Sequence, residues 1–218
     1  SIMIKIIDDL DITSDGVAIF NRKWQIVHLK QGDMDGACTV YSLMMNLLVL
    51  KVLVRNQITN LSFKFKGNTA KGRLFKEFFV KEGLCRDGFY FSEIKDKLTH
   101  SFSKKVSSSH EEYNNTQTEQ SEYIEDMKNS IDQNHPLMTA LTFTGGAHAV
   151  LAIGYEEKDD MITKVFCLDP GFTVEKSSYW NAVILLNSTP GKKYVHSYIA
   201  EGWHPDVYVS ESLKITKR

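Results

Sequence analysis

The feature that most constrains the fold is an apolar run from Val40 to Val54, rich in Leu, Val and Met. The run is 15 residues long and is interrupted by Ser42, Asn46 and Lys51. It is too short to cross a bilayer, which takes roughly 20 apolar residues. A helix that is apolar on nearly every side belongs in the core of a globular protein. We therefore predict a fully buried helix here and no membrane span.

The segment before this run, QGDMDGAC at residues 31–38, has the glycine and aspartate content of a turn-rich loop. It places Cys38 at or near the amino terminus of the buried helix. Backbone N–H groups and the helix dipole lower the pKa of a thiol there, so the nucleophilic thiolate forms more readily. An amide such as Gln31 can share an oxyanion with the N–H of Cys38. We predict that the other two cysteines, Cys85 and Cys167, are small buried side chains.

Length and charge bound the remaining possibilities. The 218 residues fit a single domain over residues 1–218. With 26 basic and 27 acidic residues, the net charge of −1 excludes the strongly basic surface expected for nucleic acid or an anionic membrane. Three cysteines are too few for a disulfide scaffold and favour a reducing compartment. No signal peptide is visible, so a cytoplasmic location is expected, with a secreted effector as the alternative.

The order of predicted elements indicates the fold class. Three short β-prone runs form a small antiparallel element near the start: residues 3–7, 17–20 and 24–29. Helices are predicted over 69–82, 92–98 (capped by Ser92) and 122–133, and the polar stretch at about 101–120 is predicted as an exposed connection or insertion. Strands are predicted over 137–143, 147–155, 162–169, 181–187 and 207–209. A helical first half followed by an antiparallel second half indicates an α+β fold.

Two further residues are candidates to activate the thiol. His148 opens an apolar strand directly after Gly145-Gly146, whereas the remaining histidines lie in polar or turn-like segments or precede a proline. A catalytic base is expected to be remote in sequence and adjacent in space. Asp169 ends the next predicted strand, where a carboxylate can hold the imidazole tautomer and stabilise its charged form. Taken singly, the two residues also fit a satisfied core histidine and a turn aspartate.

The segment 31–46, QGDMDGACTVYSLMMN, resembles the glutamine, cysteine and buried-helix segment of papain-like cysteine peptidases. GAHAVLAIGY at 146–155 and CLDP at 167–170 are similar to the histidine and aspartate strands of the same clan. The pattern resembles most the bacterial branch typified by double-glycine leader peptidases. The resemblance implies a papain-like fold, with the nucleophile helix packed on an antiparallel sheet and no cofactor or metal. It also implies roles for Gln31 (oxyanion), Cys38 (nucleophile), His148 (base) and Asp169 (orientation of the base).

Some residues depart from that pattern. Thr39 stands where many relatives have glycine, and Asp33 and Asp35 put two carboxylates close to the thiol. These acids either select a basic or amine-bearing substrate or form turn hydrogen bonds, and they should oppose thiolate formation slightly. The family pattern does not account for residues 101–120 or for the tail after Gly191. The sequence contains no membrane-spanning or ATPase region of an exporter. Whether a fusion or partner domain accompanies the chain stays open.

The predicted function is that of a cysteine peptidase or related thiol hydrolase. It would cleave an amide of a peptide or protein substrate through a thioacyl intermediate on Cys38. A deamidase or an acyltransferase would use the same residues, because these activities differ in the acceptor and in the walls of the cleft.

Two alternatives belong to other classes. The first is a catalytically silent papain-like domain that binds a peptide or protein in a groove lined by Trp180 and Trp203. The second is a zinc site made from Cys38, His148 and Asp169, with Cys167 as a further ligand.

Overall fold

The computed structural model describes residues 1–31, 38–59, 69–70, 73 and 90–218. Its main element is an eight-stranded sheet in which all paired strands run antiparallel. The strands are β1 (Ile2–Ile6), β5 (Val106–Glu112), β6 (Leu137–Phe143), β7 (Gly146–Lys158), β8 (Met161–Leu168), β9 (Ala182–Leu185), β10 (His196–Ile199) and β11 (Asp206–Lys217). The described helices are α1 (Cys38–Val49), α2 (Arg55–Thr59), α4 (Phe91–Phe102) and α5 (Gln117–Asp132). The predicted α+β class is confirmed.

The sheet curls back on itself. Its strand order is β1-β7-β6-β11-β10-β9-β8, and β7 also pairs with β8, so the path closes into a ring, while β5 pairs with β11. In the β7–β8 ladder, Leu151 lies opposite Leu168. His148 precedes Leu151 by three residues and Asp169 directly follows Leu168. The antiparallel pairing therefore brings His148 and Asp169 to the same end of the two strands.

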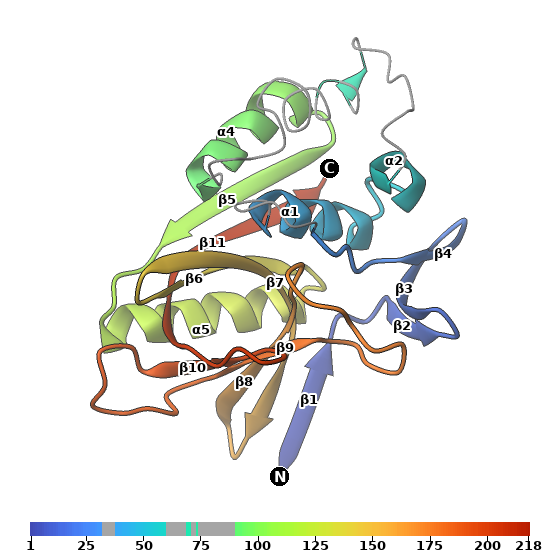
Figure 1. The fold of residues 1–218 in the computed structure, drawn as a ribbon. Coiled ribbons are helices and arrows are strands. Elements are labelled where there is room, and N and C mark those ends of the chain that lie inside the picture. Colours follow the sequence, from blue (N-terminus) through green and yellow to red (C-terminus); the bar gives the residue numbers. More distant parts are fainter. Residues whose placement is uncertain (32–37, 60–68, 71–72, 74–89) are drawn as a thin grey trace.

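Helices cover the sheet on both sides. Figure 1 shows α1 and α4 above the part of the sheet formed by β5, β11 and β6, and α5 below it. All positions of β6 from Leu137 to Leu141 are buried, as expected for a strand covered on both faces.

The nucleophile helix is buried as predicted. Every residue of α1 from Ser42 to Val49 is buried, and the helix packs against β7 and β6. Ser42 Oγ donates to the carbonyl of Ala149 at 3.1 Å, which ties the helix to β7 beside His148. Within the described ranges, no helix is long and apolar enough for a bilayer span.

The predicted amino-terminal element is partly wrong. A three-stranded sheet does form, from β2 (Leu10–Thr13), β3 (Gly16–Asn21) and β4 (Lys23–Ile26). The first strand, however, leaves this element, because β1 pairs along its length with the outer part of β7. The outer part of the long β7 has an edge available for pairing there. The sequence of a strand does not by itself determine which strand it pairs with.

The prediction of a connection over residues 101–120 is wrong in its middle. That stretch contains β5, which pairs with β11 from Glu211 to Lys217, and the first residues of α5. Much of the stretch is exposed, as predicted. An outer strand with one solvent-exposed face can carry serine, histidine and glutamate, so its amino-acid composition resembles that of a loop.

Helix starts also differ from the predictions. α4 begins at Phe91 after Tyr90, which forms no side-chain cap, so Ser92 is not its cap. α5 begins at Gln117, five residues earlier than predicted, because Thr116 caps the helix: its Oγ1 accepts from the Glu119 N–H at 3.2 Å. The predicted helix at 69–82 falls largely outside the described residues, as do Cys85, Asp33 and Asp35.

In the second half, the strand predicted over 137–143 is confirmed, and the strands predicted over 147–155 and 162–169 match β7 and β8 within a few residues. β10 was not predicted, and β11 is much longer than residues 207–209. The register of β11 shifts between Val209 and Glu211, so Ser210 is an extra residue that breaks the alternation a strand prediction relies on.

Candidate active site

The thiol of Cys38 lies at the amino terminus of the buried helix, as predicted. Cys38 is the first residue of α1 and is a partly buried free cysteine. The backbone N–H of Ala149 donates to its Sγ at 3.4 Å. The thiol is therefore held against β7, next to His148.

His148 is bound to the predicted carboxylate. Its Nε2 lies 2.8 Å from Oδ1 of Asp169. The Cys38 thiol also lies near the His148 side chain, close enough for each group to shift the pKa of the other. Because Nε2 is occupied by Asp169, Nδ1 is the ring nitrogen available to the thiol. The structure thus brings together three of the four predicted site residues in the order thiol, imidazole, carboxylate.

The thiol and the imidazole each shift the pKa of the other so that both charged forms are favoured. Burial alone would raise the pKa of Cys38, but the hydrogen bond and positive charge of His148 outweigh burial and lower it. Burial alone would lower the pKa of His148, but its bonds to Asp169 and Cys38 raise it to about 10. These directions are those of a thiolate–imidazolium pair, the state in which a thiol is nucleophilic.

Asp169 is fully buried, and its carboxylate is satisfied by hydrogen bonds. Besides His148, the Gly171 N–H donates to Oδ1 at 2.7 Å and the Tyr198 hydroxyl donates to Oδ2. Asn181 holds the backbone: its Oδ1 accepts from the Asp169 N–H at 2.7 Å and its Nδ2 donates to the Asp169 carbonyl at 2.9 Å. A buried charge persists only with such partners, so these residues keep the carboxylate oriented toward His148.

Aromatic rings enclose the imidazole. Trp203 packs edge-on against His148, with ring centroids 5.6 Å apart, and Tyr198 lies at 6.5 Å. Phe172 stacks near Trp203 at 6.4 Å. These rings shield the bond between His148 and Asp169 from water, which strengthens it.

The thiol and the imidazole open into a cleft of about 550 Å³. Its walls come from α1, the start of α4 and strands β5, β6, β7 and β11. The lining residues are Cys38, Thr39, Tyr90, Phe91, Glu112, Tyr113, Asn114, Ala140, Thr142, Ala147, His148, Ala149, Tyr208, Ser210 and Glu211. The thiol and the imidazole therefore face a cleft that solvent reaches.

Comparison with known proteins identifies the family of this chain. The model of the Peptidase_C39 like family matches residues 21–200, which include all four predicted site residues. The chain belongs to the Peptidase_C39 like family. A solved structure, UfSP from C. elegans, aligns over 99% of this chain at 14% identity and a TM-score of 0.45. The chain spans 34% of that structure's length. No curated protein matches the chain.

Membership in the Peptidase_C39 like family supports the predicted papain-like peptidase clan and a cysteine peptidase-like hydrolase. The double-glycine branch and the roles of the individual residues stay predictions.

Gln31, the fourth predicted site residue, lies beside the turn that follows Asp169. Its backbone N–H donates to the carbonyl of Pro170 at 2.7 Å, directly after Asp169. Its side-chain Oε1 is buried and accepts no hydrogen bond from the described residues. The backbone bond places Gln31 at the aspartate end of the site, whereas no described contact joins its side chain to Cys38.

Sequence reasoning missed several residues of the site. His28 is one of the histidines that the sequence places in a polar or turn-like segment, but it is buried and its Nε2 lies 2.9 Å from the carbonyl of Asp169. Asn181 and Tyr198 follow Asp169 by 12 and 29 positions, without a motif of their own. Asn181 at the start of a predicted strand was the one available signal, because a buried amide there needs a partner.

The residues named for the alternatives lie elsewhere or act differently. Trp180 stacks on Phe166 at 3.9 Å and does not line the cleft with Cys38, while Trp203 packs on the imidazole of His148. Cys167 is buried, as predicted, and its pKa is raised by burial and by Asp169. Among the described residues, the group with metal-ligand distances is His110, Glu112 and Glu211, not Cys38, His148 and Asp169.

Proposed function

We propose that this chain is a thiol peptidase that cleaves a peptide or isopeptide amide through a thioacyl intermediate on Cys38. The observation that carries the proposal is the linear arrangement of Cys38, His148 and Asp169, with Nε2 and Oδ1 2.8 Å apart at the end of an open cleft. A buried structural histidine has no need of a partly buried thiol on its other side.

In the first half of the reaction, the Cys38 thiolate attacks the amide carbon and a bond forms between Sγ and that carbon. The carbonyl oxygen takes the negative charge, and the N–H of Cys38 with the amide of Gln31 stabilises it. His148 then gives the proton on Nδ1 to the leaving nitrogen, the carbon–nitrogen bond breaks, and the amine departs.

In the second half, water attacks the thioacyl carbon. His148, now neutral, accepts a proton from the water at Nδ1, and the bond between Sγ and the acyl carbon breaks. The acid product leaves, and the thiolate–imidazolium pair is restored. Asp169 holds the ring orientation and stabilises its positive charge in both halves.

The finer substrate proposal follows the resemblance to double-glycine leader peptidases. By that resemblance we propose a narrow cleft at Cys38, which would select small side chains on the acyl side of the scissile bond. We expect cleavage after Gly-Gly. If Gly-Gly peptides stay intact while other peptides are cleaved, the proposed Gly-Gly specificity is wrong, whereas the proposed thiol peptidase mechanism is retained.

The test is a peptide library digested with the parent chain and with Cys38→Ala, with new termini identified by mass spectrometry. Cleavage by the parent alone, and a thioacyl adduct whose mass maps to Cys38, would support the proposal. If the parent retains peptides without cleaving any, the site is a binding module. A matched control is Cys167→Ala, because Cys167 is buried away from the cleft and its loss should leave the cleavage pattern unchanged.

A further inference from the structure

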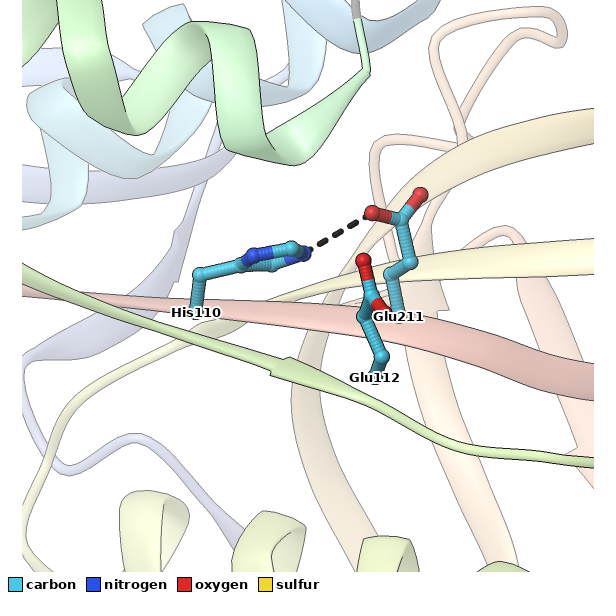
Figure 2. A group of neighbouring side chains, drawn as sticks. All are labelled: His110, Glu112 and Glu211. Atoms are coloured by element: carbon cyan, nitrogen blue, oxygen red, sulfur yellow. Dashed lines mark hydrogen bonds and ion pairs between the residues drawn. The ribbon is translucent and has the colours of Figure 1, made fainter.

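A second group of ionisable side chains lies on the wall of the cleft, on β5 and β11. His110 and Glu112 are two residues apart on β5 and therefore project from the same face. Glu211 of β11 lies directly opposite Glu112. Figure 2 shows the three side chains on one side of the two strands, with His110 and Glu211 turned toward each other. The group thus comes from two strands in fixed register.

The three side chains are already close. His110 Nε2 lies 2.8 Å from Glu211 Oε1, and one ligand atom from each of the three residues lies within 4.8 Å of the others. The side chains of His110 and Glu211 are 12% and 19% exposed, while Glu112 is exposed. Glu112 and Glu211 line the same cleft as Cys38, so solvent and ions reach the group.

The charges of this group are not balanced. Carboxylates directly opposite each other on neighbouring strands destabilise a sheet. A protonated His110 can offset one of the two negative charges. In the described part of the chain, no lysine or arginine forms an ion pair with Glu112 or Glu211. Among the described residues, His110 is the one basic side chain that pairs with either carboxylate.

We propose that His110, Glu112 and Glu211 bind a divalent transition-metal ion, with zinc as the best fit. An imidazole nitrogen with two carboxylate oxygens suits zinc, whereas magnesium and calcium prefer oxygen ligands alone. Zinc bonds of about 2.0–2.2 Å place tetrahedral ligand atoms about 3.4 Å apart. The His110 and Glu211 atoms, at 2.8 Å, lie closer together than that value, and all three ligand atoms lie within 4.8 Å of one another, so the side chains would rotate slightly on binding the ion.

Three protein ligands leave a fourth position open toward the cleft. That position can hold water or a carboxylate of a bound peptide. The ion site is separate from Cys38 and His148, so it stands or falls independently of the proposed peptidase chemistry.

The test is equilibrium dialysis of the chelator-treated full chain against zinc, with bound metal counted by mass spectrometry. We expect about one zinc per chain. Glu112→Gln should weaken binding at least about tenfold, because even loss of a residue that only supports a ligand costs that much. Glu112 is exposed, so this substitution leaves the packing intact. His110→Ala should weaken binding as well.

Two controls make the result specific. Glu111→Gln removes the same charge from the neighbouring exposed position on the other face of β5 and should leave zinc binding unchanged. Cys38→Ser removes the competing thiol and should also leave it unchanged. Cobalt in place of zinc should give a spectrum without a thiolate charge-transfer band. Absence of bound zinc, equal affinity in Glu112→Gln, or loss of binding in Cys38→Ser would overturn the proposal.

Discussion

Two histidines of this molecule each form a hydrogen bond with a carboxylate. They differ in the third group that lies near the pair. His148 and His110 each bring Nε2 to 2.8 Å from a carboxylate oxygen, and each side chain is 12% exposed. The partner of His148, Asp169, is fully buried, whereas Glu211 is 19% exposed. On the other side of His148 stands a thiol, but beside His110 stands a second carboxylate, Glu112.

The comparison teaches that the third group decides the chemistry of a histidine–carboxylate pair. A thiol next to the imidazole gives up its proton and becomes a nucleophile. A second carboxylate has no proton to give at neutral pH, so it adds negative charge and attracts a cation. Burial sets the strength of each pair, because water screens the more exposed pair, His110 and Glu211, more strongly than the pair of His148 and Asp169.

The largest expected effect is that of His148→Ala on catalysis. The variant loses the group that holds the thiolate and protonates the leaving amine, so kcat/KM should fall by about a million-fold, as for other members of catalytic triads. Kinetics with a cleaved peptide measures this. His100→Ala, an exposed histidine at the end of α4, is the matched control and should retain parental activity. Comparable activity of His148→Ala and the parent would refute the assignment.

Asp169→Asn should have the next largest effect. We expect a decrease of about ten-thousand-fold in kcat, because an amide favours the wrong tautomer of the imidazole. The hydrogen bond and charge of Asp169 raise the pKa of His148, so their loss lowers it. The imidazolium then loses its proton at lower pH, and the alkaline limit of kcat/KM should move down. An unchanged alkaline limit would mean that Asp169 does not set the state of His148.

Tyr198→Phe tests how burial strengthens the pair. Tyr198 is fully buried and donates to Asp169 Oδ2, so the variant leaves a buried charge with one donor fewer. The free energy of unfolding should fall by about 1.5–3 kcal/mol. Tyr123→Phe is the control, because that equally buried hydroxyl bonds to the neutral Thr139 at 2.9 Å and should cost about 1 kcal/mol. Urea unfolding compares the two, and a larger loss in Tyr123→Phe would contradict the account.

Glu211→Gln should have the smallest effect. In metal-free protein, the bond to His110 is partly solvated and Glu211 opposes Glu112, so the free energy of unfolding should change by less than about 1 kcal/mol. Urea unfolding in the presence of a chelator measures it. A loss of unfolding free energy as large as that expected for Tyr198→Phe would show that the two pairs do not differ in the way proposed.

The sequence predicts the parts of the fold and site that depend on local pattern. The apolar run and the loop before it predict the buried helix and place Cys38 at its start, and β6 is confirmed residue for residue. The strand order was not predictable, because β1 and β5 join the large sheet through partners distant in sequence. A polar outer strand such as β5 has the composition of a loop.

The same limit holds for the site. His148 and Asp169 flank adjoining strands, so their approach follows from a hairpin that the sequence predicts. Tyr198, Asn181 and His28 reach Asp169 from segments whose path depends on the closed ring of strands. The group at His110 depends on the β5–β11 register, which no motif encodes.

The central claim is that Cys38 and His148 form a thiolate–imidazolium pair, and the alkylation rate of Cys38 tests it most directly. Iodoacetamide labelling would be followed by peptide mass spectrometry between about pH 5 and 9, in the parent and in His148→Ala, with buried Cys167 as an internal reference. The account predicts rapid labelling of Cys38 well below the ~8.5 pKa of a free thiol, lost in His148→Ala. A Cys38 rate that follows an ordinary thiol and does not change in His148→Ala would contradict it.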